Sequence, residues 1–426
     1  MNIVTKGFAV LLTACMLISF AGCGEERIIS QDYQIGNSQH GIANAVMKTD
    51  TGYYYSQNGF RGLSLHYYDE KNAKSMYLCN KPECRHDGNE FCAATSDKYS
   101  VAGTTLYSNA LYINTIEETE TSYEFKLLKA ALDGSSLSEV VTYFSVNSVG
   151  VGASADDLVI HRNKAFLGYS AGNSDNDQVG FNGTAIYDLE TGELSYLGEK
   201  EGDIEITQHS FCGYGDYMYF ITAEKYKKRL CRYSYTDGSV EELPLERNFK
   251  GQYTIYDGDT IFYERGNGEL YIYNPNTKDN RSVDIKAQEW YGISLGEGNG
   301  WVDAGIKGMI SDGKYLYISE NKDISRFSPI PILLDATESD GDYWKYAEIN
   351  ILDKEGNFVN TFVFNTEEIL GYSDYFSFHF CGDTIYMQTP KMMYECTRED
   401  FVAGKPEFKE VYPIDIWMPS MREVEE

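Results

Sequence analysis

The residues best suited to chemistry fall within one 14-residue segment. Cys79, Cys84, His86 and Cys92 follow the spacing C-x4-C-x-H-x5-C, and thiolates together with an imidazole are ligands that zinc prefers. Four protein ligands close the coordination sphere, so the segment predicts a structural zinc site and not a catalytic one. We expect the four side chains to converge, with their sulfur atoms within ~4 Å of one another.

Three alternatives to a zinc site stay open at the level of the sequence. Two of the three cysteines could form a disulfide, which an exported protein permits, and the third would remain a thiol. All three cysteines could instead stay unligated thiols. His86 could also simply point into solvent. The spacing is not one of the common zinc-finger arrangements, so it does not decide among these states.

The N-terminus has the pattern of a lipoprotein signal peptide. Lys6 supplies a positive charge, residues 7–20 form an apolar run, and small residues precede Cys23. The pattern predicts a signal peptide over residues 1–22 and acylation of Cys23, typically with palmitate. A plain secretory signal peptide or a short membrane anchor is the alternative, because Phe20 stands where such motifs usually carry leucine. Residues 23–35 are expected to form a tether that holds the body outside the cell membrane.

Charge and missing motifs exclude several classes of function. The formal net charge is −29 at pH 7, and this charge repels nucleic acid, so no nucleic-acid partner is expected. No segment after the signal is long and apolar enough to cross a bilayer, so the lipid anchor is the expected membrane contact. The sequence has no H-E-x-x-H motif, phosphate-binding glycine loop or dinucleotide fingerprint, and no cofactor other than zinc is expected.

An aromatic repeat runs through the rest of the chain. Each copy has a turn with Gly, Asp or Asn, a short aromatic strand, a second strand and a further turn, at a mean spacing of ~55 residues. The aromatic strands are centred near Tyr54, Tyr112, Phe166, Tyr219, Phe262, Tyr317 and Tyr386. One such sheet cannot bury both of its faces, whereas a radial arrangement of sheets can.

The repeat therefore predicts an all-β fold, a β-propeller of seven blades with four antiparallel strands each. The propeller is expected over residues 36–416, with a C-terminal tail over 417–426, and N- and C-terminal strands are expected to mix where the ring closes. Six or eight blades, an irregular β-sandwich, or two β domains are the alternatives. The Cys/His segment follows the expected outer strand 74–78, so it should clip the connection between the first two blades.

One repeat carries a family resemblance. Residues 126–135 close a strand with a Leu-Asp-Gly turn, which resembles the blades of YWTD-type propellers. The lipobox, the aromatic repeats and the early Cys/His segment are together similar to a group of uncharacterised Gram-positive surface lipoproteins. The resemblance implies a propeller and brings no known activity.

Four further cysteines form two similar pairs, Cys212 with Cys231 and Cys381 with Cys396. In each pair we expect the first cysteine on the first strand of a blade and the second on the third strand. Two strand spacings amount to ~9.6 Å, and a disulfide needs Cα atoms within ~7 Å. All four are therefore expected to be reduced and buried between blades.

No motif points to catalysis. Residues 168–172 match the G-x-S-x-G pattern around Ser170, but this motif needs a strand, a sharp turn and a helix, and the following residues break helices. We therefore expect a binding or scaffold module that holds a protein, peptide or glycan through loops at one propeller face. The alternative is a surface glycan-active enzyme, which would need carboxylates that converge near the central channel.

Overall fold

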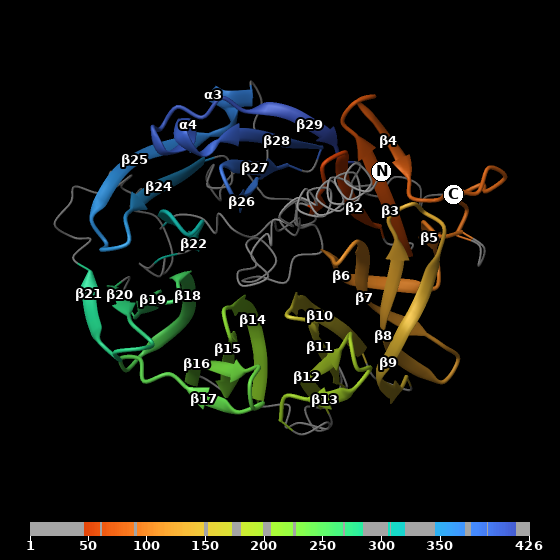
Figure 1. Ribbon diagram of the computed structural model, residues 1–426, viewed down its shortest axis with the longest axis horizontal. Helices are drawn as coiled ribbons and strands as arrows, with labels where there is room; N and C mark the ends of the chain where they lie inside the picture. Colours follow the sequence, from red (N-terminus) through yellow and green to blue (C-terminus); the bar gives the residue numbers. More distant parts are fainter. Residues whose placement is uncertain are drawn as a thin grey trace, which may run out of the picture.

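The strands form seven antiparallel sheets arranged as the blades of a β-propeller (Figure 1). The computed structural model describes residues 47–59, 62–88, 92–148, 152–172, 180–198, 206–224, 227–266, 269–283, 306, 308–319, 346–370, 376–389 and 391–414. The expected signal peptide, lipid-attachment Cys23, tether and C-terminal tail lie outside these residues. The described strands, from Met47 to Pro413, fall within the expected propeller.

Strands follow one another in chain order within each blade. Blade 1 has β1 (Met47–Lys48), β2 (Gly52–Gly59), β3 (Gly62–Asp69), β4 (Lys74–Tyr77) and the extra β5 (Thr95–Ser96). Blade 2 has β6 (Tyr99–Tyr107), β7 (Ala110–Glu118), β8 (Ser122–Ala131) and β9 (Leu137–Asn147). Blade 3 has β10 (Gly152–His161), β11 (Lys164–Gly172), β12 (Gly180–Asp188) and β13 (Leu194–Tyr196).

The remaining four blades repeat this meander. Blade 4 has β14 (Ile206–Tyr214), β15 (Tyr217–Glu224), β16 (Lys227–Ser234) and β17 (Val240–Glu242). Blade 5 has β18 (Phe249–Asp257), β19 (Thr260–Arg265), β20 (Glu269–Tyr273) and β21 (Asn280–Val283). Blade 6 has β22 (Gly308–Ser311), β23 (Leu316–Ser319), β24 (Tyr346–Leu352) and β25 (Phe358–Asn365). Blade 7 has β26 (Ser377–Cys381), β27 (Thr384–Gln388), β28 (Met392–Thr397) and β29 (Lys409–Pro413), and the short helices are α3 (Thr366–Leu370) and α4 (Arg398–Val402).

The expectation of seven four-stranded blades is confirmed, and only 4% of the described residues are helical. All seven residues that marked the aromatic repeat lie on the second strand of their blade. In β15, Met218 and Phe220 pack toward blade 3, while Tyr219 and Ile221 pack toward blade 5. Both faces of a middle strand are thus buried, which explains why these strands read as continuous apolar and aromatic runs.

The expected mixing of N- and C-terminal strands at ring closure is wrong for the described part of the chain. Blade 1 contains only N-terminal strands and blade 7 only C-terminal strands. An aromatic cluster joins the two blades instead, with Tyr53 and Tyr55 of β2 against Tyr386 of β27 and Tyr412 of β29. Side-chain packing therefore closes the ring, and no hydrogen-bonded strand crosses from one end of the chain to the other within the described ranges.

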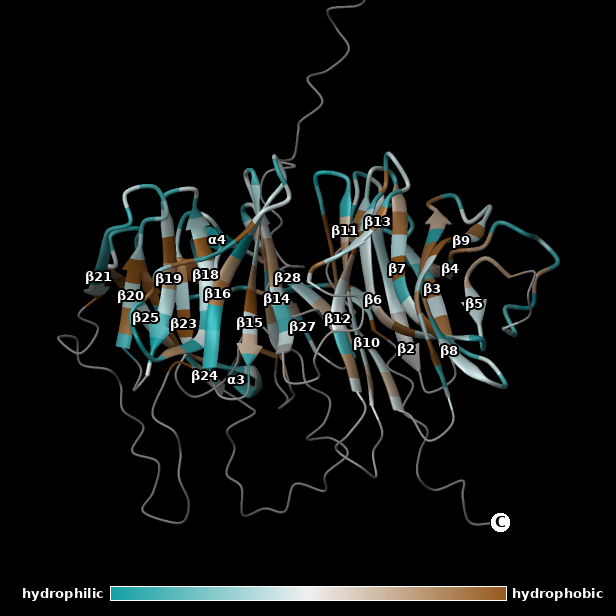
Figure 2. Ribbon diagram, turned by 90° about the horizontal axis from the view of Figure 1, so that it is seen from below, coloured by the Kyte–Doolittle hydropathy of each residue, from teal (hydrophilic) through white to brown (hydrophobic). Residues whose placement is uncertain are grey.

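The two faces of the ring differ in their connections. At one face, tight turns join the first and second strands of blades, as at Ser108–Asn109 and Arg162–Asn163, whose φ values of 44°, 61°, 48° and 61° match a type I′ turn. The strands that precede residues 78–98, 173–179, 284–307 and 320–345 are β4, β11, β21 and β23, and each of them ends at the opposite side of the ring. We call that side the loop face; the short turns line the upper edge of the ring in Figure 2.

The paired cysteines lie on the strands expected of them. Cys212 is on β14 and Cys231 on β16, with β15 between them, and they face opposite sides of the sheet. None of the seven cysteines of the described part forms a disulfide in this structure. The expectation of burial is wrong for Cys381, which is exposed, because it ends β26 beside the turn at Gly382 and leaves the packed part of the sheet. No helix in the described ranges is long and apolar enough to cross a membrane.

Candidate metal centre

The Cys/His segment is an insertion in the outer edge of blade 1. Both β4 and β5 pair with β3, and the residues between them loop outward. Leu65 of β3 holds both ends of this loop: its carbonyl accepts from Leu78 N at 3.0 Å, and its N–H donates to the Ala94 carbonyl at 2.7 Å. The loop is therefore fixed at its base by the sheet, and its ligands are presented at the outer rim of the ring.

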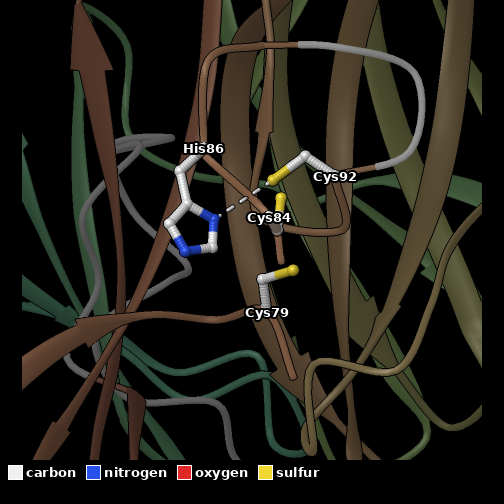
Figure 3. Close-up of side chains that lie close together, drawn as sticks. All are labelled: Cys79, Cys84, His86 and Cys92. Carbon is white, nitrogen blue, oxygen red and sulfur yellow. Dashed lines mark hydrogen bonds between the residues drawn. The ribbon is translucent and has the colours of Figure 1, made fainter. Parts of the chain in front are cut away.

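The four predicted ligands converge (Figure 3). The ligand atoms of Cys79, Cys84, His86 and Cys92 all lie within 4.8 Å of one another. Cys92 Sγ is 3.5 Å from His86 Nδ1. Cys92 is buried, and the other three are half-buried. The expected convergence of the four side chains on one point is confirmed.

The surroundings of Cys92 favour its thiolate form. Its sulfur accepts from Thr95 Oγ1 at 3.1 Å, Thr95 N at 3.3 Å and Ala94 N at 3.4 Å. Burial alone would raise the pKa of the Cys92 thiol, but the hydrogen bonds from Thr95, His86 and the Ala94 backbone outweigh it and lower the pKa to about 6. Donors aimed at a sulfur in this way are typical of the outer shell of a metal site.

The surroundings of Cys84 disfavour its thiolate form. The His86 backbone N–H favours its thiolate, but desolvation and the neighbouring sulfurs of Cys92 and Cys79 outweigh that bond and raise the pKa of the Cys84 thiol. Three thiolates so close together repel one another, so they can all ionise only when a cation neutralises them.

Backbone geometry shapes the loop. Cys84 N donates to the Lys81 carbonyl at 3.1 Å and forms a tight turn before the second ligand. Gly88 has φ of 83°, and a Cβ there would lie 2.6 Å from Asp97 Oδ1. Glycine is therefore required at this position by both the left-handed backbone and the contact.

The site also touches the second blade. Asn80 N donates to the Gly134 carbonyl at 3.1 Å, and a Cβ at Gly134 would lie 2.8 Å from Cys79 N. Tyr54 of blade 1 donates to the Leu132 carbonyl in the same turn at 3.0 Å. The Leu-Asp-Gly turn of blade 2 thus abuts the ligand loop, as expected for a clip between the first two blades.

Sequence reasoning missed the aromatic surroundings of His86. The imidazole stacks on Tyr77 at 4.6 Å between ring centroids, and Tyr77 lies 4.7 Å from His66. His66 stacks on Tyr55 at 5.1 Å, and Tyr55 on Tyr412 at 4.8 Å. We call these five rings the aromatic column. It connects the metal centre to the seam between blades 1 and 7. Its only signal in the sequence is that aromatic residues and histidine recur at alternate positions along β2, β3 and β4.

The donor set fits zinc. Tetrahedral coordination at a Zn–S distance of ~2.3 Å places ligand atoms ~3.8 Å apart, so small rotations of the side chains would complete the geometry. A disulfide that includes Cys92 would leave the hydrogen bonds to its sulfur without a thiolate to receive them. With four protein ligands the zinc would have no open position, so its role would be to fix the fold.

The G-x-S-x-G pattern has no nucleophile geometry. Ser170 lies within β11 and pairs with Ser154 of β10 and Asn182 of β12. Its hydroxyl donates to the Ser154 carbonyl at 3.3 Å. A residue paired on both sides of a strand is not on a strand-to-helix turn, so the pattern belongs to the sheet.

Comparison with known proteins supports the fold. No protein-family model matches the chain, and no curated protein matches it. Among solved structures, one from a study of two prolyl endopeptidases has a TM-score of 0.52 at 10% identity and covers 96% of this chain. This chain spans 55% of that structure.

Two further structures are similar at lower scores. The β-propeller domain of the Trilobed protease from Pyrococcus furiosus has a TM-score of 0.41 at 10% identity, covering 74% of this chain and 85% of its own. An uncharacterised protein from Listeria monocytogenes has a TM-score of 0.40 at 10% identity, covering 74% of this chain and 84% of its own.

Proposed function

We propose that the protein is a membrane-anchored extracytoplasmic lipoprotein whose propeller is a binding or scaffold module. Acylation of Cys23 would hold it at the outer side of the cell membrane, and the loop face would meet a ligand. The observation that carries the proposal is the asymmetry between the two faces, with tight turns on one and the long connections on the other.

Rigid blades with variable loops suit binding. The seven blade interfaces hold the strand ends in fixed positions, and loops displayed by a rigid scaffold commonly carry recognition. The metal centre would serve this scaffold, because it lies at the outer rim and clips blade 1 to blade 2. Zinc would therefore be a structural cofactor.

Anchoring is tested by metabolic labelling with an alkyne analogue of palmitate. The expected result is label on the wild-type protein, none on Cys23→Ala, and biotinylation of the protein on intact cells by an impermeant reagent. Cys15→Ala, within the same N-terminal segment, is the matched control and should keep the label. An unlabelled wild-type protein that is released to the medium would contradict the anchor.

Binding is tested with an array of cell-surface glycans and peptides probed with the mature protein. We expect the array to retain the protein on one ligand class. Substitutions on the loop face should reduce this retention, and substitutions on the opposite face should not. Chemical conversion of a retained glycan during the assay would instead indicate the surface glycan-active enzyme. Equal effects of substitutions on both faces would contradict the assignment of the loop face.

A further inference from the structure

A groove opens on the loop face between blades 4 and 5. Its volume is about 700 Å³, and it is lined by the end of β15, the start of β16 and the connection 243–249. Sites for small molecules and short oligomers commonly have volumes in this range. None of the residues around it belongs to the metal centre.

Unpaired cations surround this groove. Lys227, Lys228 and Arg247 line it and are exposed, and none forms an ion pair with a residue in the described ranges. Four of the five residues from 225 to 229 are basic in a chain whose net charge is −29. The groove is thus a locally basic region on a strongly acidic protein.

Two of the three carboxylates in the lining share one arginine. Arg229 lies 2.9 Å from Glu224 and 3.6 Å from Glu242, and these two ion pairs form one wall of the groove. Glu246 is the remaining acid in the lining. The lining therefore holds four cations against three carboxylates. This small positive excess in a strongly acidic protein favours an anionic ligand.

The Lys228 side chain packs against Gly251 of the neighbouring blade. A Cβ at Gly251 would lie 2.4 Å from Lys228 Cδ and 2.8 Å from its Nζ, and Gly251 has φ of 90°. The lysine side chain thus fills the space that any larger residue at 251 would occupy.

The base of the groove is apolar. Leu230 and Leu243 are buried beneath it, and Leu245 and Phe249 are half-buried along it. Cations above an apolar base match a chain of sugars, whose ring faces are apolar and whose acidic substituents lie at the edges. A single small anion would leave most of this volume empty.

We infer that this groove binds a short acidic oligosaccharide, with carboxylate or phosphate groups held by Lys227, Lys228 and Arg247. The inference rests on the proposed binding function and names a ligand class for it. The net charge of the protein does not forbid such binding, because charges farther away than ~8 Å are largely screened at physiological ionic strength.

The test uses the mature protein and two fluorescent probes of matched length, oligomannuronate for carboxylates and a phosphorylated oligomannose for phosphates. Fluorescence anisotropy should show binding of at least one probe that weakens as salt is added. The variant K227Q/K228Q/R247Q should lose affinity by about tenfold or more, since it removes all three charge-assisted contacts. The preferred probe identifies the acidic group.

The matched control is K278Q/K405Q/K409Q, which removes the same charge from exposed lysines at the opposite face. It should bind within about twofold of wild type, because those charges are distant from the groove. Equal losses in both variants, tighter binding of an oligoglutamate peptide, or binding of neither probe would overturn the inference. In the last case, retention of a neutral glycan on the array would leave the proposed function standing.

Folding of the variants is checked by thermal melting. If the triple substitution unfolds, Arg247→Gln alone tests the same contact, because Arg247 is exposed in a connection. Its affinity should fall with an unchanged melting temperature, and an unchanged affinity would contradict the inference.

Discussion

Tyr55 of β2 and Tyr412 of β29 stack face to face, with ring centroids 4.8 Å apart and an interplanar angle of 17°. They belong to the first and last blades, so this contact closes the ring. Tyr53 adds a second link, with its hydroxyl 3.4 Å from that of Tyr386. Within the described ranges, closure thus depends on side chains that are far apart in sequence, without a shared strand.

The first prediction concerns this seam. Tyr412→Ala should lower the free energy of unfolding by about 3–5 kcal/mol, because it removes a fully buried aromatic ring. Hydrogen exchange should increase mainly in blades 1 and 7. Tyr263→Ala, at the interface of blades 4 and 5, should cost a similar amount without faster exchange at the seam. Uniform exchange across the ring in Tyr412→Ala would show that the seam is not a separate weak point.

The second prediction concerns the aromatic column. Tyr77→Leu should weaken zinc binding by about tenfold, the lower end of the effect of outer-shell substitutions, because His86 loses the ring on which it stacks. Met76→Leu is the control, since Met76 is the exposed neighbour of Tyr77. Zinc affinity is measured by competition with a chromogenic chelator. The same affinity in both variants would show that the stack does not orient His86.

The third prediction concerns pH. Burial, and then repulsion from His86, lowers the pKa of His66 to about 4. Burial also lowers the pKa of His379 to about 4, although a hydrogen bond with Gln388 acts in the opposite direction. Both histidines are neutral in the folded state, whereas the unfolded chain takes up a proton near pH 6.5. Stability should therefore be retained above pH 6.5 and fall as the pH drops toward 4, by at most about 3 kcal/mol for each histidine.

Urea denaturation of metal-free protein at several pH values measures this loss. His379→Gln should flatten the decline between pH 6.5 and 4, because one of the two titrating groups is removed. A decline of unchanged steepness would assign the acid sensitivity to other groups.

The fourth prediction concerns the paired cysteines. Cys212, Cys231, Cys381 and Cys396 should all react with a thiol reagent when unreduced protein is unfolded in chelator. Cys381 should react first in the folded protein, because it is the exposed member. The loss of two reactive thiols from this set would mean that a disulfide forms across the middle strand of a blade.

Much of the fold could be predicted because the repeat is local. Tyr54, Phe166 and Tyr386 mark second strands through turn residues and aromatic runs that lie within a few positions of them. The ligand loop was visible for the same reason, since Cys79 to Cys92 fall on one short segment. The strand positions of Cys212 and Cys231 followed from the meander.

Long-range packing could not be predicted in this way. The contact between Tyr55 and Tyr412 depends on how the first and last blades meet, and no periodicity encodes it. His66 looked like an isolated histidine until β3 placed it between Tyr55 and Tyr77. The exposure of Cys381 depends on where β26 ends, and strand ends are the least certain feature of a sequence pattern.

The central claim is that Cys79, Cys84, His86 and Cys92 hold one zinc ion that clips the first two blades together. The most direct measurement is elemental analysis of purified protein alongside Cys84→Ser and the control Cys396→Ser, which lies outside the site. One zinc per chain in wild type and Cys396→Ser, with little in Cys84→Ser, is the predicted result. A wild-type protein without bound metal, whose mass is two hydrogens lower because two of these cysteines form a disulfide, would contradict it.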